Sequence, residues 1–319
     1  MSAASGASGG WAMAVPDATS LTGKGGRETP PLDPGVADRA PTGTSLLVRV
    51  GSAVVLLAAI LGAFALGPLP TYIVLGIMVL IGVVEFYLIT RHMGAPAAPW
   101  VLFPLTLVFL FRFQLNRYSP AILPGAITAA VALGLGGFLL SPRPVDGMTR
   151  WAFAVAGALY LGWSLGYYFA LFSIHEPDPA RVGVAWLAAL AGSTVIGDTA
   201  ALLVGSRLGR HPFFPIVSPR KTVEGAIGGF VAQTIFFALM ILLANVPLLH
   251  GLVLGMLVAV AAQAGDLIES QFKRAARLKD ASSFVPGHGG MLDRIDSLVL
   301  IPGVAYYYMA LVLHAKLPL

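Results

Sequence analysis

Apolar runs of about 20 residues recur along most of this chain, and each is long enough to cross the hydrocarbon core of a bilayer as one helix. Hydrophobic residues make up 57% of the sequence and charged residues only 11%. Soluble domains are about 45–50% apolar and about 25% charged. We therefore predict an all-α, polytopic membrane protein.

Nine membrane spans are predicted, of which the third is short. They are Leu46–Gly67, Thr71–Thr90, Trp100–Phe113, Ala121–Leu140, Trp151–Phe172, Val182–Leu203, Val223–Asn245, Gly251–Ser270 and Ile295–Ala315.

Three regions follow from this pattern. Residues 1–45 are small, polar and rich in Gly, Pro, Ser and Thr, so we expect a disordered tail. Residues 46–172 are predicted to form N-terminal transmembrane helices, and residues 173–319 a catalytic transmembrane region with two basic cytoplasmic loops. We expect no cleaved signal peptide, because the first long apolar run begins only near Leu46.

Lysine and arginine are unevenly divided between the two sides that these spans define. With the tail on one side, that side holds 16 of the 20 Lys and Arg residues. Cytoplasmic loops carry an excess of these residues, so we predict a cytoplasmic N-terminus and an external C-terminus. The chain has no cysteine, which excludes disulfides, thiolate nucleophiles and cysteine metal sites.

Acidic residues collect beside the two basic loops, Ser206–Thr222 and Gln271–Arg294. The strings "DLIES" and "DRIDS" each place an acid, a second acid three residues later and a serine four residues later, all on one helical face. The two helices run in opposite directions, so we expect their acids to meet near the cytoplasmic surface. The acids concerned are Asp198, Asp266, Glu269, Asp293 and Asp296.

Two interpretations of these acids stay open. In the first they form ion pairs with Arg274, Arg277 or Arg294 at a helix junction. In the second they bind a hard cation, above all Mg²⁺, because oxygen ligands without cysteine do not resemble a zinc site. Magnesium also prefers a substrate phosphate among its ligands, and the basic loops would suit such a substrate.

The string "SPRKT" predicts an anion site at a helix start. Ser218 is suited to cap the helix and Pro219 to occupy its first turn, which would aim backbone N–H groups, Arg220 and Lys221 at a ligand. The alternative is that these basic residues anchor the helix end to lipid headgroups; for Lys221 we favour the ligand.

Two further residues allow more than one role. His288 in "PGHGG" is a general base, a phosphate donor or a plain interfacial histidine, and no P-loop motif accompanies it. Glu85 in "VVEFY" either reaches the same cavity or pairs with Arg91, and we favour the pair.

The run "SQFKRAARLKDASSFVPGHGGMLDRID", Ser270–Asp296, resembles the signature of the phosphatidate cytidylyltransferase family, also called CDP-diacylglycerol synthases. The elements S-x-x-K-R, K-D, P-G-H-G-G and D-R-x-D occur in order without a gap. The resemblance extends upstream through Gly197–Asp198, Ser218–Gly225 and Gly265–Ser270, so it covers the C-terminal half well.

This resemblance implies that CTP and phosphatidate react to give CDP-diacylglycerol and pyrophosphate. It places a multi-pass enzyme in the bacterial cytoplasmic membrane, with its active site facing the cytoplasm. It also implies Mg²⁺, with K⁺ as a second cation. Membrane lipids are expected partners, nucleic acid is not, and a homodimer is left open.

The resemblance assigns roles to individual residues. Metal binding falls to Asp266 and Asp293, with Asp198 and Asp296 either as further ligands or as acids beside those ligands. The catalytic set is Asp266, Asp293, Lys221, Lys273, Arg274 and His288, with the basic members holding phosphates. Substrate binding falls to Ser218, Arg220, Ser270, Lys279, Gly287, Gly289, Gly290 and Arg294.

Two other functions compete with this one. A CTP-dependent polyprenol kinase or an archaeal-type synthase could share the acids and basic loops, although the continuous "PGHGGMLDRID" speaks against the kinase. A transporter could use intramembrane acids as an ion path, but transporter sites lie near the midplane between repeated halves, and here the charges collect at one face of one half.

Overall fold

The structure is a computed structural model of the 319-residue chain and describes residues 55, 59–60, 62–63, 66–172, 179–243, 245–282, 284 and 289–313. The chain separates into two units, Met1–Thr42 and Gly43–Leu319, and all described residues belong to the second. The predicted tail and most of the first predicted span, Leu46–Gly67, lie outside the described residues.

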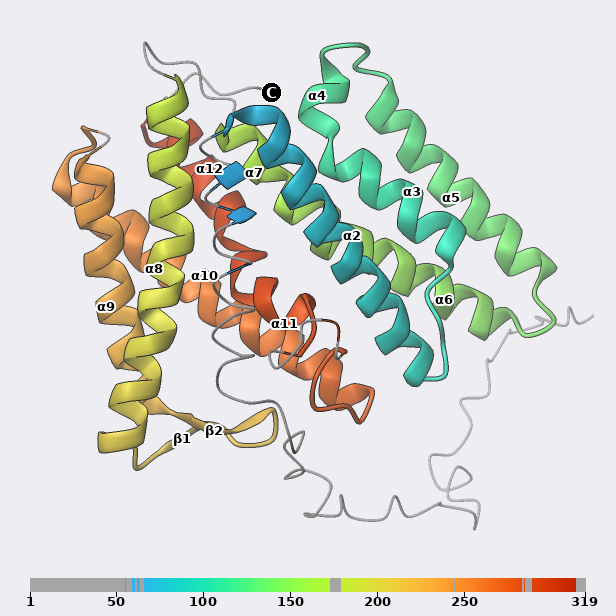
Figure 1. The fold of residues 1–319 in the computed structure, drawn as a ribbon. Coiled ribbons are helices and arrows are strands. Elements are labelled where there is room, and N and C mark those ends of the chain that lie inside the picture. Colours follow the sequence, from blue (N-terminus) through green and yellow to red (C-terminus); the bar gives the residue numbers. More distant parts are fainter. Residues whose placement is uncertain are drawn as a thin grey trace, which may run out of the picture. The chain divides into compact units, whose positions relative to one another are not determined.

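Helices make up nearly all of the described chain (Figure 1). The first group is α2 (Pro68–His92), α3 (Pro99–Leu110), α4 (Arg112–Asn116), α5 (Ile122–Leu140), α6 (Pro144–Gly157), the π-helical η2 (Ala158–Trp163) and α7 (Ser164–Phe172). The second group is α8 (Pro179–Leu208), α9 (Val223–Leu242), α10 (Leu248–Ala275), α11 (Leu292–Ile295), the 3₁₀ turn η3 (Asp296–Leu298) and α12 (Ile301–Leu311).

Six helices of the described part are long and apolar enough to cross a membrane. They are Leu69–His92, Ile122–Leu140, Pro144–Leu171, Trp186–Leu208, Val223–Leu242 and Leu248–Ala275, which match six of the predicted spans. The third predicted span corresponds to the shorter apolar helix α3, continued by α4. The last predicted span, Ile295–Ala315, is divided among the end of α11, η3 and α12 instead of forming one helix.

The helices of the first group pack against one another through buried apolar side chains. Helix α3 lies against η2 and α6, and glycines allow this close approach. A Cβ atom at Gly162 of η2 would stand 2.5 Å from the carbonyl oxygen of Thr106 in α3. One at Gly157 of α6 would stand 3.0 Å from Cδ1 of Leu102 in α3 and 2.4 Å from the ring of Phe86 in α2. Phe86 and Leu102 are fully buried here.

Helices α8, α9 and α10 lie side by side, and α8 and α10 carry Asp198, Asp266, Ser270, Lys273 and Arg274 of the predicted site (Figure 1). Helices α8 and α9 meet through small residues: a Cβ atom at Gly225 would be 2.8 Å from the Ala201 carbonyl oxygen, and one at Gly229 would be 2.9 Å from that of Gly197. Such contacts bring two membrane helices to the closest spacing that their backbones permit.

An antiparallel hairpin of β1 (Pro212–Phe214) and β2 (Ser218–Thr222) joins α8 to α9, so the fold is not purely helical. The prediction that Ser218 caps a helix and that Pro219 lies in its first turn is wrong, because both belong to β2. Thr222 is the cap instead, and its Oγ1 accepts a hydrogen bond of 3.2 Å from Gly225 N. Helix α9 therefore begins at Val223, where the predicted span also begins, and Pro219 lies before it in the hairpin.

Candidate active site

A cavity of about 400 Å³ lies between α8, the hairpin and α10. Its polar lining includes Asp198 from α8, Arg220 and Lys221 from β2, and Gln263 and Asp266 from α10. Apolar residues complete the wall, among them Leu202, Phe213 and Leu267. The cavity thus brings carboxylates and cations together beside the ends of membrane helices.

Lys221 and Asp266 form an ion pair across this cavity, between Nζ and Oδ2. Asp198 lines the same cavity and interacts electrostatically with Asp266, Lys221 and Arg294. Three of the predicted site residues, drawn from α8, β2 and α10, therefore share one cavity. The extended backbone of β2 places Lys221 here, whereas the prediction used a helix start.

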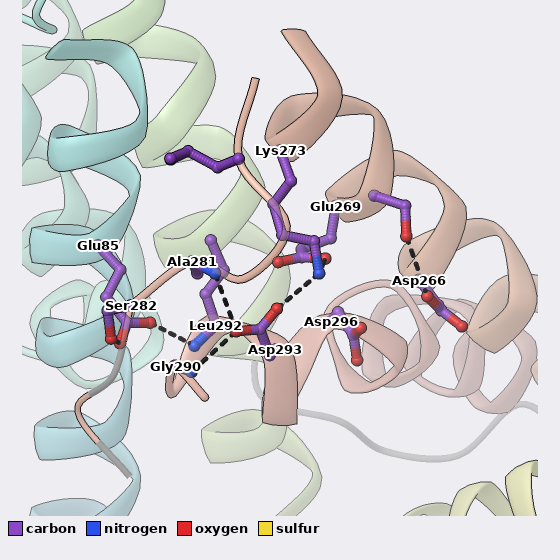
Figure 2. Close-up of polar contacts among 12 residues, drawn as sticks. Glu85, Asp266, Glu269, Lys273, Ala281, Ser282, Gly290, Leu292, Asp293 and Asp296 are labelled. Atoms are coloured by element: carbon purple, nitrogen blue, oxygen red, sulfur yellow. Dashed lines mark hydrogen bonds and ion pairs between the residues drawn. The ribbon is translucent and has the colours of Figure 1, made fainter. Parts of the chain in front are cut away.

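Lys273 forms a second cluster of charged groups with Glu269 and Asp293, about two turns beyond Asp266 on α10 (Figure 2). Its Nζ atom pairs with the buried Glu269 and stands 2.5 Å from Oδ1 of Asp293. The acids of this site are therefore neutralised by lysines, and the arginine pairs that we considered are not needed for Asp266, Glu269 or Asp293.

Asp293 binds both ends of the loop that follows α10. Its Oδ2 accepts hydrogen bonds from Ala281 N at 3.0 Å and from Gly290 N at 2.8 Å. Gly289 beside it has a φ of 82°, in the left-handed region that favours glycine. The N–H of Gly290, a residue that the resemblance assigns to substrate binding, is directed to this carboxylate.

Asp296 joins the two acid motifs. It interacts electrostatically with Asp266, Asp198 and Lys273, and its own carbonyl oxygen would stand 2.4 Å from a Cβ atom at Gly265. Because Gly265 has no side chain, η3 can lie directly against α10 next to Asp266. The expectation that acids of the "DLIES" and "DRIDS" strings come together is confirmed for Asp266 and Asp296.

Glu85 of α2 also reaches this region, so our preference for a pair with Arg91 was wrong. Its carboxylate accepts hydrogen bonds from Ser282 Oγ, Met291 N and Leu292 N. Six residues separate Glu85 from Arg91, which places the two side chains on different faces of the helix. A single acid within an apolar span was the available signal, since such a residue usually faces a partner.

The remaining predicted residues are placed as follows. Arg274 donates from Nε to the Val217 carbonyl oxygen at 3.1 Å and from Nη1 to that of Leu278 at 3.3 Å. Ser270 Oγ stands 3.5 Å from Asp266 Oδ1. Lys279 is partly buried in the loop after α10. Gly287 and His288 lie outside the described residues.

The donor chemistry of the cavity fits Mg²⁺ better than a metal held by the protein alone. Within the described residues, no three His, Asp or Glu side chains gather closely enough to hold a metal ion. Asp198 and Asp266 nevertheless both line the cavity, and Mg²⁺ is usually held by one or two carboxylates together with substrate phosphates and water.

Comparison with known proteins places this arrangement in a family. The model of the cytidylyltransferase family matches residues 47–312, nearly the whole chain. The chain belongs to the cytidylyltransferase family. The match includes the cavity, both acid motifs and Glu85, so every described residue of the site lies within it.

Individual members of the cytidylyltransferase family share part of this sequence. A phosphatidate cytidylyltransferase of Bacillus subtilis (strain 168) is 33% identical over 161 residues, which cover 50% of this chain and 58% of the relative. One of Staphylococcus haemolyticus is 34% identical over 154 residues, covering 47% and 55%. One of Staphylococcus saprophyticus is 40% identical over 106 residues, covering 33% and 41%. The chain thus spans about half the length of the curated relatives that it matches.

Proposed function

We propose that this protein transfers the cytidylyl group of CTP to phosphatidate, giving CDP-diacylglycerol and pyrophosphate. The observation that carries the proposal is the cavity between α8, β2 and α10, where Asp198, Asp266 and Lys221 meet beside apolar helix ends. A nucleoside triphosphate needs cations and a metal at one place, and a lipid phosphate must arrive from the bilayer. Membership of the cytidylyltransferase family and the names of the relatives support the same reaction.

The reaction needs no covalent intermediate. An oxygen of the phosphatidate phosphate forms a bond to the α-phosphorus of CTP, and the bond from that phosphorus to the α,β-bridging oxygen breaks, so that pyrophosphate leaves. A phosphate monoester is mostly dianionic at neutral pH, so the nucleophile needs no general base. Catalysis then consists of holding the two phosphates in line and neutralising their charge.

In this proposal Lys221 and Arg220 hold the phosphates, and Lys273 holds Asp293 in place. Lys221 and Arg220 face the cavity from β2, and Lys273 lies beside Asp293. The Lys221–Asp266 ion pair keeps the ammonium group at the cavity before substrate arrives. When a phosphate enters, the same ammonium can bind it without moving far.

Magnesium would be held by Asp198 and Asp266, with Asp296 close by. When bound, it would neutralise phosphate charge on CTP and on the leaving pyrophosphate. Asp293 as a metal ligand and K⁺ as a second cation stay predictions; in the structure the two carboxylate oxygens of Asp293 accept from Lys273 and from backbone N–H groups.

We also propose that the cavity faces the cytoplasm of a bacterial cell, where CTP is made, as the distribution of Lys and Arg predicts. A homodimer belongs to the same proposal. A Cβ atom at Gly136 or Gly137 of α5 would meet no described atom within 4 Å, so this part of α5 can accept a second helix at close range.

The test is an assay of the purified full chain in phosphatidylcholine vesicles, with CTP and Mg²⁺ supplied. We expect pyrophosphate release only when phosphatidate is present, with CDP-diacylglycerol as the lipid product by mass spectrometry. Release of CDP with a polyprenol acceptor would indicate the kinase instead. If no CTP is consumed with any lipid phosphate, the proposed function is wrong.

A further inference from the structure

We propose that Glu85 is a positioning residue for this site: it fixes the backbone at Met291 and Leu292, and thereby the arrangement of Asp293 and Lys273. The inference rests on the proposed function, because Asp293 and Lys273 are residues to which we assign a part in the transfer. It adds a residue from the first group of helices to a site built from the second.

Glu85 is engaged by the loop region through both carboxylate oxygens (Figure 2). Oε1 accepts from Ser282 Oγ at 2.5 Å and from Met291 N at 2.9 Å, and Oε2 accepts from Leu292 N at 2.6 Å. The residue is only 2% exposed. A carboxylate buried in a membrane helix is costly unless its oxygens are bonded, so these contacts account for its presence there.

Asp293 holds the same two pieces of chain from the other side. It accepts from Ala281 N and Gly290 N, the neighbours of the residues that Glu85 holds. The two carboxylates therefore connect residues 281–282 to residues 290–292. Leu292 precedes Asp293 directly, so a shift of its N–H group moves the carboxylate that pairs with Lys273.

The fit of Glu85 depends on bare backbone at Gly290. A Cβ atom there would stand 2.9 Å from each Glu85 carboxylate oxygen and 2.9 Å from Cβ of Ala281. Real Cβ atoms essentially never come this close to their neighbours, so glycine is required for the carboxylate to reach Met291 and Leu292. Gly290 thus belongs to the contact with Glu85, in addition to any contact with substrate.

The Glu85→Gln variant tests the hydrogen bonds of Glu85 while keeping the size and shape of its side chain. Glutamine has almost the same size, but one carboxylate oxygen becomes an NH₂ group that can only donate. Whichever way the amide turns, a buried donor of Ser282, Met291 or Leu292 loses its acceptor. Ser282→Ala removes one of these donors from the opposite side and leaves α2 unchanged.

The control is Thr90→Val on the same helix. Thr90 is 1% exposed, donates to the Tyr87 carbonyl oxygen and accepts from Ala97 N, and it forms no hydrogen bond with the described residues of the loop after α10. Valine keeps its shape and removes both hydrogen bonds. We expect this variant to lose thermal stability while its turnover number stays near that of the wild type.

The experiment compares the wild-type full chain, the three single variants and the Glu85→Gln/Ser282→Ala double variant in phosphatidylcholine vesicles by hydrogen exchange and by pyrophosphate release. We expect Glu85→Gln to speed exchange of the amides of Met291 and Leu292, with α8 and α9 unchanged. Its kcat should fall about tenfold to a hundredfold, because small misplacement of a positioned group costs this much. Ser282→Ala should show the same changes to a smaller degree, and the double variant should lose little more than Glu85→Gln alone.

The proposal is overturned if exchange at Met291 and Leu292 is unchanged in Glu85→Gln, or if Thr90→Val loses as much kcat at an equal fall in Tm. Should Glu85→Gln fail to fold, Ser282→Ala decides by the same two readouts. A wild-type chain without pyrophosphate release would refute the proposed function, and exchange would still show whether Glu85 holds the loop.

Discussion

Two lysines form ion pairs with carboxylates of the site. The side chain of Lys221 is 34% exposed and that of its partner Asp266 is 25% exposed, whereas Lys273 is 12% exposed between two more deeply buried acids. The first pair can therefore open toward a ligand, while the second is enclosed. A partly exposed pair costs little to separate, because solvent screens both charges. This difference suits Lys221 for binding substrate and Lys273 for holding Asp293.

Lys221→Met should impair use of the nucleotide or lipid phosphate without loss of folded protein. The change removes the ammonium group and leaves Asp266 without its cation in the cavity. We expect kcat/KM to fall at least about tenfold, or roughly 1.4 kcal/mol. Lys221→Arg is the control, because it keeps the charge with a different donor geometry. Wild-type kinetics in Lys221→Met would mean that the lysine only anchors the hairpin.

At the level of elements, α8 and α9 pack closely against each other beside the cavity. Glycines on both helices bring their backbones together, and this spacing sets the distance between Asp198 on α8 and the hairpin that enters α9. Thr222 starts α9, and Glu224 in its first turn accepts hydrogen bonds from Arg210 N and His211 N. These hydrogen bonds attach the start of the hairpin to the first turn of α9. They thereby help to fix the position of Lys221 next to Asp266 of α10.

Gly229→Val should separate α8 from α9. The new Cβ atom would stand 2.9 Å from the Gly197 carbonyl oxygen and 3.0 Å from Cβ of Ala201, so the helices must move. Overpacking of this kind costs about 1–3 kcal/mol. We expect a lower Tm and a lower turnover number. Gly125→Val on α5 is the matched change, because its Cβ would meet no described atom within 4 Å, and it should leave both nearly unchanged.

At the scale of the whole molecule, the site uses both groups of helices. The cavity belongs to α8, β2 and α10, but the segment that carries Asp293 is held by Glu85 of α2. The first helices therefore do more than fill the bilayer around the second group. Because one hydrogen-bonded carboxylate joins the groups, a change in α2 can reach the pair of Asp293 and Lys273.

The membrane helices could be predicted because hydrocarbon leaves an apolar run of sufficient length one main choice, an internally bonded helix. The acids of "DLIES" and "DRIDS" could be placed together for a similar reason, since adjacent antiparallel spans return to the same side. These predictions depend only on the local composition of the chain and on the number of spans between two motifs.

Other features depend on contacts between distant residues and could not be predicted. Pro219 suits a first helical turn and a strand of a hairpin equally, and pairing of Phe214 with Ser218 decided for the strand. The division of the last span follows from the approach of Asp296 to Gly265, with Pro302 opening a new helix at α12. The donors that Glu85 meets lie about 200 residues later, with Ser282 at a separation of 197.

The most direct test of the central claim is the rate of pyrophosphate release by Asp266→Asn enzyme, measured with CTP and phosphatidate over a range of Mg²⁺ concentrations. Loss of a carboxylate that holds the metal should remove several kcal/mol of charge stabilisation in the transition state. We predict that wild-type turnover vanishes in EDTA and returns with Mg²⁺, and that Asp266→Asn lowers turnover at least about a hundredfold, or roughly 2.7 kcal/mol. Asp293→Asn should do the same and Glu269→Gln should cost less. Near-normal turnover of correctly inserted Asp266→Asn enzyme at limiting Mg²⁺ would contradict the account and reduce the acids of the cavity to helix-end ion pairs.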